Sequence, residues 1–142
     1  MIQRIQSVWL FLAALCAALT YKFSFYSGNK PGIDNKPPAF QELTASSHFI
    51  LLISTAILVG GCFFIIFLYK DRKLQLSLTI GAIALSVINL IIYFGQTKKF
   101  LPAEGNYDLS AILVLIIPIF LVLAVRGIWK DEKLVKSLDR LR

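Results

Sequence analysis

Four long apolar segments alternate with short polar ones along the chain. They run from about 5 to 21, 48 to 69, 74 to 94 and 109 to 129. Each is close to the roughly 20 residues that a helix needs to cross a bilayer core about 30 Å thick. None contains Asp, Glu or Lys, and Arg126 is the one Arg, near the end of the fourth. The pattern predicts four membrane-spanning helices, because lipid offers exposed backbone groups no hydrogen-bond partner.

The expected fold is therefore all-α: a four-helix transmembrane bundle in which residues 1–142 form a single membrane domain. Residues 70–73 between the second and third segments allow only a tight turn, so those two helices should be antiparallel neighbours. The first segment resembles a signal peptide, but residues 20–23 lack the small-residue pattern of a cleavage site. We expect it to be retained as a helix.

Two loops lie on the side of the membrane opposite the 70–73 turn, and they differ in character. The outer loop, 22–47, has a centre at 28–38 that is dense in Gly, Pro and Asn and is expected to be irregular. Just before it, residues 21–26 alternate large apolar and smaller polar side chains. That alternation indicates either a short strand or aromatic residues at the membrane interface, and we favour the interface. The later loop, 95–108, carries apolar residues that can pack on the first as a small cap.

The tail, 130–142, continues the fourth segment with helix-forming residues. Its three leucines recur at helical spacing, which predicts an amphipathic cytoplasmic helix that lies on lipid headgroups or on a partner protein. A solvated tail is the alternative, since short helices are marginal in water. The residues expected to make these contacts are Leu134, Leu138, Leu141, Lys133, Lys136 and Arg140.

Composition and charge agree with a membrane protein. The chain is 57% hydrophobic and 16% charged, whereas soluble domains average about 25% charged residues. If both termini are cytoplasmic, ten of the 15 Lys and Arg residues lie inside, and the net charge of +7 divides into +6 inside and +1 outside. This is the positive-inside pattern of a multi-pass membrane protein. Membrane lipid is thus the expected partner of the basic residues, and nucleic acid is not.

The sequence offers little material for catalysis. Metal and haem sites need several converging ligands, but the chain has one His, at position 48, and no acid inside a span. We expect His48 to cap the second helix or to lie among headgroups. Cys16 and Cys62 should differ in depth by about 7 Å and serve packing. With no Ser–His or paired-Asp arrangement either, we expect no enzyme activity, no cofactor and no metal.

Transporters and channels are the remaining functional class to consider. Proton-coupled transporters place an acid or His within a span, and none is present here. A passive oligomeric channel needs only polar side chains. Six polar residues of the second and third spans are the candidates, and Asn89 is the most polar of them. We expect Asn89 to form an interhelical hydrogen bond, worth about 1 kcal/mol, and not to line a pore. The six are Ser54, Thr55, Ser77, Thr79, Ser86 and Asn89.

The chain opens Met-Ile-Gln-Arg-Ile-Gln-Ser-Val-Trp-Leu and continues into an Ala- and Leu-rich first span. This start resembles that of a family of small four-span bacterial membrane proteins known as domain of unknown function 4293, typical of the Bacteroidota. Length, long outer loop, tight middle turn and charged tail agree, although they are common to many four-span proteins. The resemblance implies fold and membrane location. The family has no established activity, so it implies no catalytic residues.

We therefore expect a non-catalytic inner-membrane protein that is a subunit, accessory or scaffold of a larger complex with other membrane proteins. The alternative is a homo-oligomeric channel or small-solute carrier.

The charge distribution predicts the topology. A reporter fused after Arg142 should be cytoplasmic, and one inserted near Gly32 should be extracytoplasmic, because the basic residues cluster on the side of the termini. Alkaline phosphatase and fluorescent-protein fusions measure this. A cytoplasmic signal from the Gly32 insertion would contradict the assignment.

Overall fold

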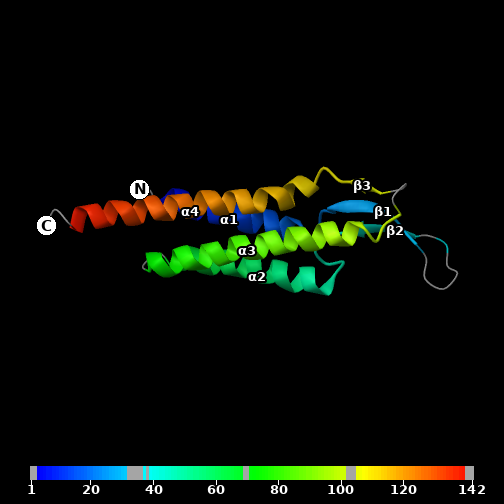
Figure 1. Ribbon diagram of the computed structural model, residues 1–142, viewed down its shortest axis with the longest axis horizontal. Coiled ribbons are helices and arrows are strands. Elements are labelled where there is room, and N and C mark those ends of the chain that lie inside the picture. Colours follow the sequence, from blue (N-terminus) through cyan, green and yellow to red (C-terminus); the bar gives the residue numbers. More distant parts are fainter. Residues whose placement is uncertain (1–2, 32–36, 38, 69–70, 102–104, 140–142) are drawn as a thin grey trace.

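The computed structural model describes residues 3–31, 37, 39–68, 71–101 and 105–139, with residues 3, 4 and 136–139 described by their backbone alone. Within these ranges four helices lie side by side along the long axis of the molecule (Figure 1). A small sheet lies at one end of the bundle, here the sheet end. The start of α1 and the end of α4 lie at the other, here the terminal end. The helices are α1 (Gln3–Leu19), α2 (Phe49–Phe67), α3 (Arg72–Thr97) and α4 (Ala111–Asp139).

The prediction of four helices is confirmed, with boundaries close to those expected. Three of them are long and apolar enough to cross a membrane: Phe49–Phe67, Arg72–Thr97 and Ala111–Val135. The apolar part of α1, Ile5–Leu19, is shorter. By length and composition of its helices, the chain is a membrane protein. The fourth helix also continues past residue 129 to Asp139, as the composition of the tail predicts.

Each helix packs against two others: α1 and α3 both contact α2 and α4. The prediction that α2 and α3 are antiparallel neighbours is confirmed (Figure 1). Small residues allow α1 to lie close to α2 and α4, because Ala13, Ala14 and Ala17 are buried in the core between these helices. Cys16 and Cys62 belong to the same core and are both free thiols. They therefore act as small packing residues in this bundle.

The all-α expectation missed a three-stranded antiparallel sheet. It consists of β1 (Tyr26–Lys30), β2 (Ala39–Leu43) and β3 (Asn106–Tyr107), in the order β2-β1-β3. One expectation for the outer loop is therefore wrong: residues 28–30 are not irregular but belong to β1. Of the alternating residues 21–26, Tyr26 alone lies in a strand, and their place at the membrane interface stays a prediction. Residues 32–36 and 38 of the same loop lie outside the described residues.

Burial against the helix ends explains why this loop forms a sheet. Phe25, Tyr26 and Leu43 are buried in a second core together with Tyr93 and Phe100. The Phe25 ring lies 4.8 Å from the ring of Tyr93, measured between centroids. Aromatic pairs at this separation stabilise beyond the area they bury. The strand thus gains its stability from contacts with α3 that lie far away in sequence.

The loop 95–108 contributes β3 to the sheet, which confirms the prediction that this loop packs on the outer loop 22–47. Tyr26 and Ser27 of β1 pair with β3. The backbone N–H of Leu101 donates to the carbonyl of Asn29 over 3.0 Å. Asp108 accepts hydrogen bonds from the hydroxyls of Ser24 and Ser27. These bonds tie the loop before α4 to the loop after α1.

The second core predicts a large effect of truncating Phe25. Phe25→Ala should lower the free energy of unfolding by about 3–5 kcal/mol, because it empties a ring site surrounded by other aromatic rings. Thermal unfolding of the detergent-solubilised protein measures it. Phe40→Ala is the matched control, since Phe40 of β2 is 66% exposed and should change stability little. Equal losses in the two variants would contradict the assignment of this core.

Candidate functional site: a polar seam and a terminal latch

One face of α3 is polar along its whole length. Every buried residue of this helix has a polar group, and their spacing places them on one side. The opposite side carries exposed Ile80, Val87, Ile88 and Ile91. This arrangement suits a helix whose outer face meets lipid, which is as apolar as the side chains it contacts. The buried set, here the polar seam, consists of Gln75, Thr79, Ser86, Asn89 and Tyr93.

Near the terminal end, the polar seam is hydrogen-bonded to helix backbone. The Gln75 amide donates to the carbonyl of Ile65 on α2 over 3.3 Å, and the Thr79 hydroxyl donates to the Gln75 carbonyl over 2.7 Å. The same Ile65 carbonyl also accepts from the backbone N–H of Leu68, the C-cap residue of α2. Gln75 therefore adds a second hydrogen bond to this carbonyl and connects α3 to the end of α2.

In the half nearer the sheet, the polar seam makes a direct bond between two helices. The hydroxyl of Ser54 on α2 donates to Asn89 Oδ1 over 2.5 Å, and both residues are buried. Ser86 donates to the carbonyl of Ile83 within its own helix. Among the other polar candidates from the sequence, Thr55 is buried whereas Ser77 is exposed on the outer face. The interior thus collects most of these groups and hydrogen-bonds several of them.

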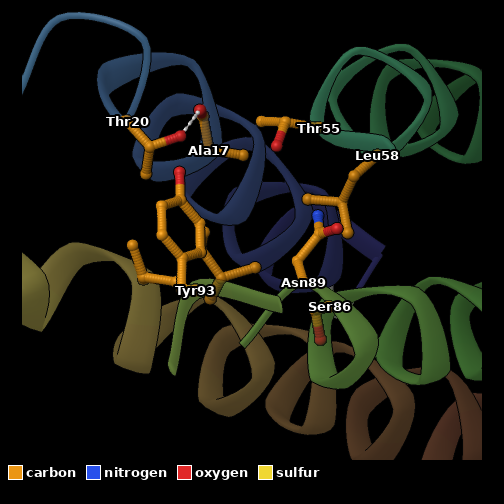
Figure 2. A pocket seen from close by; sticks show the side chains of 9 residues that line it. Ala17, Thr20, Thr55, Leu58, Ser86, Asn89 and Tyr93 are labelled. Carbon is orange, nitrogen blue, oxygen red and sulfur yellow. Dashed lines mark hydrogen bonds between the residues drawn. The ribbon is translucent and has the colours of Figure 1, made fainter. Parts of the chain in front are cut away.

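A small cavity lies beside Asn89 and Tyr93, between the helices (Figure 2). It offers about 10 Å³, close to the space that one water molecule needs. Tyr93 is 2% exposed, and its hydroxyl has no hydrogen-bond partner. In Figure 2 this hydroxyl points toward Thr20, whose own hydroxyl donates to the Ala17 carbonyl over 2.7 Å. The lining residues are Ala17, Thr20, Thr55, Leu58, Ser86, Asn89, Tyr93, Val114 and Ile117.

A second polar cluster, here the terminal latch, joins the start of α1 to the end of α4. It consists of Gln6, Arg72, Gly127 and Asp131. The Gln6 amide donates to the buried carboxylate of Asp131, and Arg72 Nη1 donates to the Asp131 backbone carbonyl over 3.0 Å. Gly127 leaves room for the Gln6 side chain, since a Cβ at that position would lie 2.8 Å from Gln6 Cγ. Three helices therefore meet at Asp131: α1 at its carboxylate, and α3 at its backbone carbonyl.

The terminal latch was not predicted, because neither Gln6 nor Asp131 stands out in the sequence as part of a site. Gln6 and Asp131 are 125 positions apart, and no local pattern connects them. Two signals were available. Gln6 lies in the Met-Ile-Gln-Arg-Ile-Gln start, and Gly127 and Asp131 are one helical turn apart on α4. A Gly one turn before an acid leaves room on that face of the helix. A polar side chain from another helix can then pass over the Gly and reach the acid.

The tail residues expected to contact headgroups or a partner are only partly described. Lys133 is exposed and Leu134 is 50% exposed, both on the part of α4 beyond the terminal latch. The backbones of Lys136 and Leu138 lie within α4, while their side chains lie outside the described residues. Arg140 and Leu141 also lie outside the described residues.

Metal-ligand residues do not gather within the part of the chain that the structure describes: no group of three His, Cys, Asp or Glu occurs there. His48 is the N-cap residue of α2, as one of its two expected roles requires, but its side chain makes no capping hydrogen bond. His48 thus occupies the N-cap position without using its imidazole as the cap. Its backbone carbonyl instead accepts a bond from the N–H of Leu52.

A protein-family model described as "Domain of unknown function (DUF4293)" matches residues 2–141. The chain belongs to this family, and the resemblance seen at its start is confirmed. The same comparisons found no matching curated protein and no matching solved structure.

The terminal latch predicts different outcomes for two similar substitutions. Gly127→Ala should displace the Gln6 side chain and weaken its bond to Asp131, which lowers the free energy of unfolding by about 1.5–3 kcal/mol. The matched control is Gly81→Ala, because a Cβ there meets nothing within 4 Å and helix propensity favours Ala. Denaturation in detergent compares the two. If both variants were as stable as the parent, Gln6 would not need the space at Gly127.

Proposed function

We propose that this member of the DUF4293 family is a non-catalytic four-span protein of a bacterial inner membrane, and that it acts as a subunit or accessory of a larger membrane protein complex. The observation that carries the proposal is the projection of α4 beyond the bundle. The helix has 29 residues and is thus about 43 Å long at 1.5 Å per residue. A bilayer core is about 30 Å thick, so the last turns extend past it.

The packing of α1 supports its assignment as a membrane span beside the three longer helices. Its apolar stretch, Ile5–Leu19, lies against both α2 and α4, which are long enough to cross the membrane. The bond from Gln6 to Asp131 keeps the start of α1 level with the later part of α4 (Figure 1). Both termini then lie on one side, as an even number of spans requires. Exposed basic residues at this end, among them Lys73, Arg126 and Lys130, favour the cytoplasmic side for it.

The projecting part of α4 has the surface of a contact site. Trp129 is 63% exposed, Leu134 is 50% exposed and Val135 is 40% exposed. Lys130 and Lys133 are exposed beside them, so basic side chains flank the apolar ones. The terminal latch holds the base of this segment against α1 and α3. A segment held at a defined angle loses little freedom when it binds, which favours association with a partner. The preferred partner is a protein with acidic residues around an apolar groove, and anionic headgroups are the second choice.

The interior of the bundle favours a structural role over passage of solutes. Apart from Tyr93, the groups of the polar seam bond to neighbouring helices or to their own backbone. The cavity among them offers about 10 Å³, far less than a hydrated ion or a metabolite occupies. A channel or carrier would therefore have to form between copies of the chain. That alternative is decided by the experiment below.

The tail proposal predicts a loss of partners without a loss of insertion. A variant with Asp at Leu134, Leu138 and Leu141 should still insert, because insertion depends on the apolar spans. Each buried leucine contributes about 1–2 kcal/mol to docking, so the variant should release its partners. Native membranes are solubilised in mild detergent, and blue-native electrophoresis followed by mass spectrometry compares the variant with the parent.

Leu109→Asp serves as the matched control, since Leu109 is 86% exposed just before α4, at the sheet end. It should keep the partners of the parent. A parent that migrates as a homo-oligomer alone would favour the channel or carrier instead. Unchanged partners in the triple variant would mean that the projecting part of α4 is not the docking surface.

A further inference from the structure

We propose that the cavity beside Tyr93 binds a single water molecule inside the membrane-embedded bundle. The Tyr93 hydroxyl, the Asn89 amide and the hydroxyls of Thr20 and Thr55 are its ligands. Such a site would connect the end of α1 to α2 and α3 through one bridging molecule.

The orphan hydroxyl of Tyr93 is the observation that requires a ligand. Tyr93 is 2% exposed, lines the cavity and has no hydrogen-bond partner for its hydroxyl. A phenol is both a donor and an acceptor, and buried polar groups in native proteins nearly always have a partner from protein or water. Lipid supplies neither kind of bond. The hydroxyl points toward Thr20 (Figure 2), whose own hydroxyl donates to the Ala17 carbonyl. A polar molecule in the adjoining cavity would supply the hydrogen bond that Tyr93 and Thr20 do not make with each other.

Size and charge restrict that molecule to water. The space of about 10 Å³ is near the lower limit for one water molecule and excludes larger solutes. The polar lining residues are neutral: three hydroxyl residues, one amide and Tyr93. A bare cation would be left without a compensating charge, which is costly in the bundle interior. A neutral molecule with both donors and acceptors matches this lining.

The lining residues retain capacity for further bonds. Thr20 and Ser86 donate to carbonyls of their own segments, so the lone pairs of their oxygens can still accept. Asn89 Oδ1 accepts from Ser54, and its amide group supplies donors. Figure 2 shows Thr20 and Tyr93 on one side of this region and Thr55 and Asn89 on the other. A water molecule between them meets the two to four polar partners that buried waters have.

The sign of the effect of Tyr93→Phe tests the proposal. If the hydroxyl bonds to water, its removal should lower the melting temperature by about 2–4 °C. If the hydroxyl is unpartnered in a dry cavity, its removal should instead raise the melting temperature, since a buried orphan polar group is destabilising. Tyr21→Phe calibrates the loss of a direct bond, because the Tyr21 hydroxyl donates to the Leu52 carbonyl over 2.7 Å.

Direct detection keeps the proposal testable even if a variant fails to fold. In the parent protein, in nanodiscs, NMR cross-relaxation should connect a long-lived water to the side-chain amide protons of Asn89. Ser86→Thr, which adds a methyl group to the lining, should abolish that signal. Absence of the water signal in the parent would overturn the proposal. A melting temperature of Tyr93→Phe above that of the parent would overturn it as well, since the hydroxyl would then be unpartnered in a dry cavity.

Discussion

The structure depends on one constraint: polar groups within the bundle must find partners in the protein, because the surrounding lipid provides none. This constraint explains why α3 turns its Gln, Thr, Ser and Asn residues inward. In a water-soluble bundle the same helix would bury its isoleucines. Here the fully buried residues of α3 all carry a polar group, and most of its exposed residues are apolar. Hydrogen bonds such as Ser54 to Asn89 then distinguish one packing of the helices from others that small apolar residues alone would permit.

The four helices follow from local information in the sequence, whereas the contacts between them do not. Segments without charge and of sufficient length predict a helix whatever their neighbours are. The sheet is different, because β1 pairs with strands that begin at Ala39 and Asn106. Its turn-forming residues, Gly28 and Asn29, favour an irregular loop when taken alone. Burial of Phe25 and Tyr26 against α3 overrides that preference, and only the tertiary structure reveals it.

The candidate site was predictable to a similar extent. Asn89 was identified from its polarity within a span, and the structure gives it a partner on α2. Ser77 has the same kind of side chain in the same helix but is exposed, because it lies on the opposite side from the buried residues. Helical periodicity separates the two once the buried face is known. Tyr93 was not selected, since a Tyr near the end of a span is usually an interfacial residue.

The terminal latch connects the most specific part of the sequence to the part of the molecule best suited to bind a partner. Gln6 comes from the start of the chain, which carried the family resemblance, and Asp131 lies at the base of the projecting segment of α4. Arg72, the first residue of α3, donates to the backbone carbonyl of the same residue. A movement of the projecting segment would therefore be resisted by two other helices. In this way a hydrogen bond to one buried carboxylate couples the orientation of the tail to the packing of the whole bundle, which is what a rigid docking element requires.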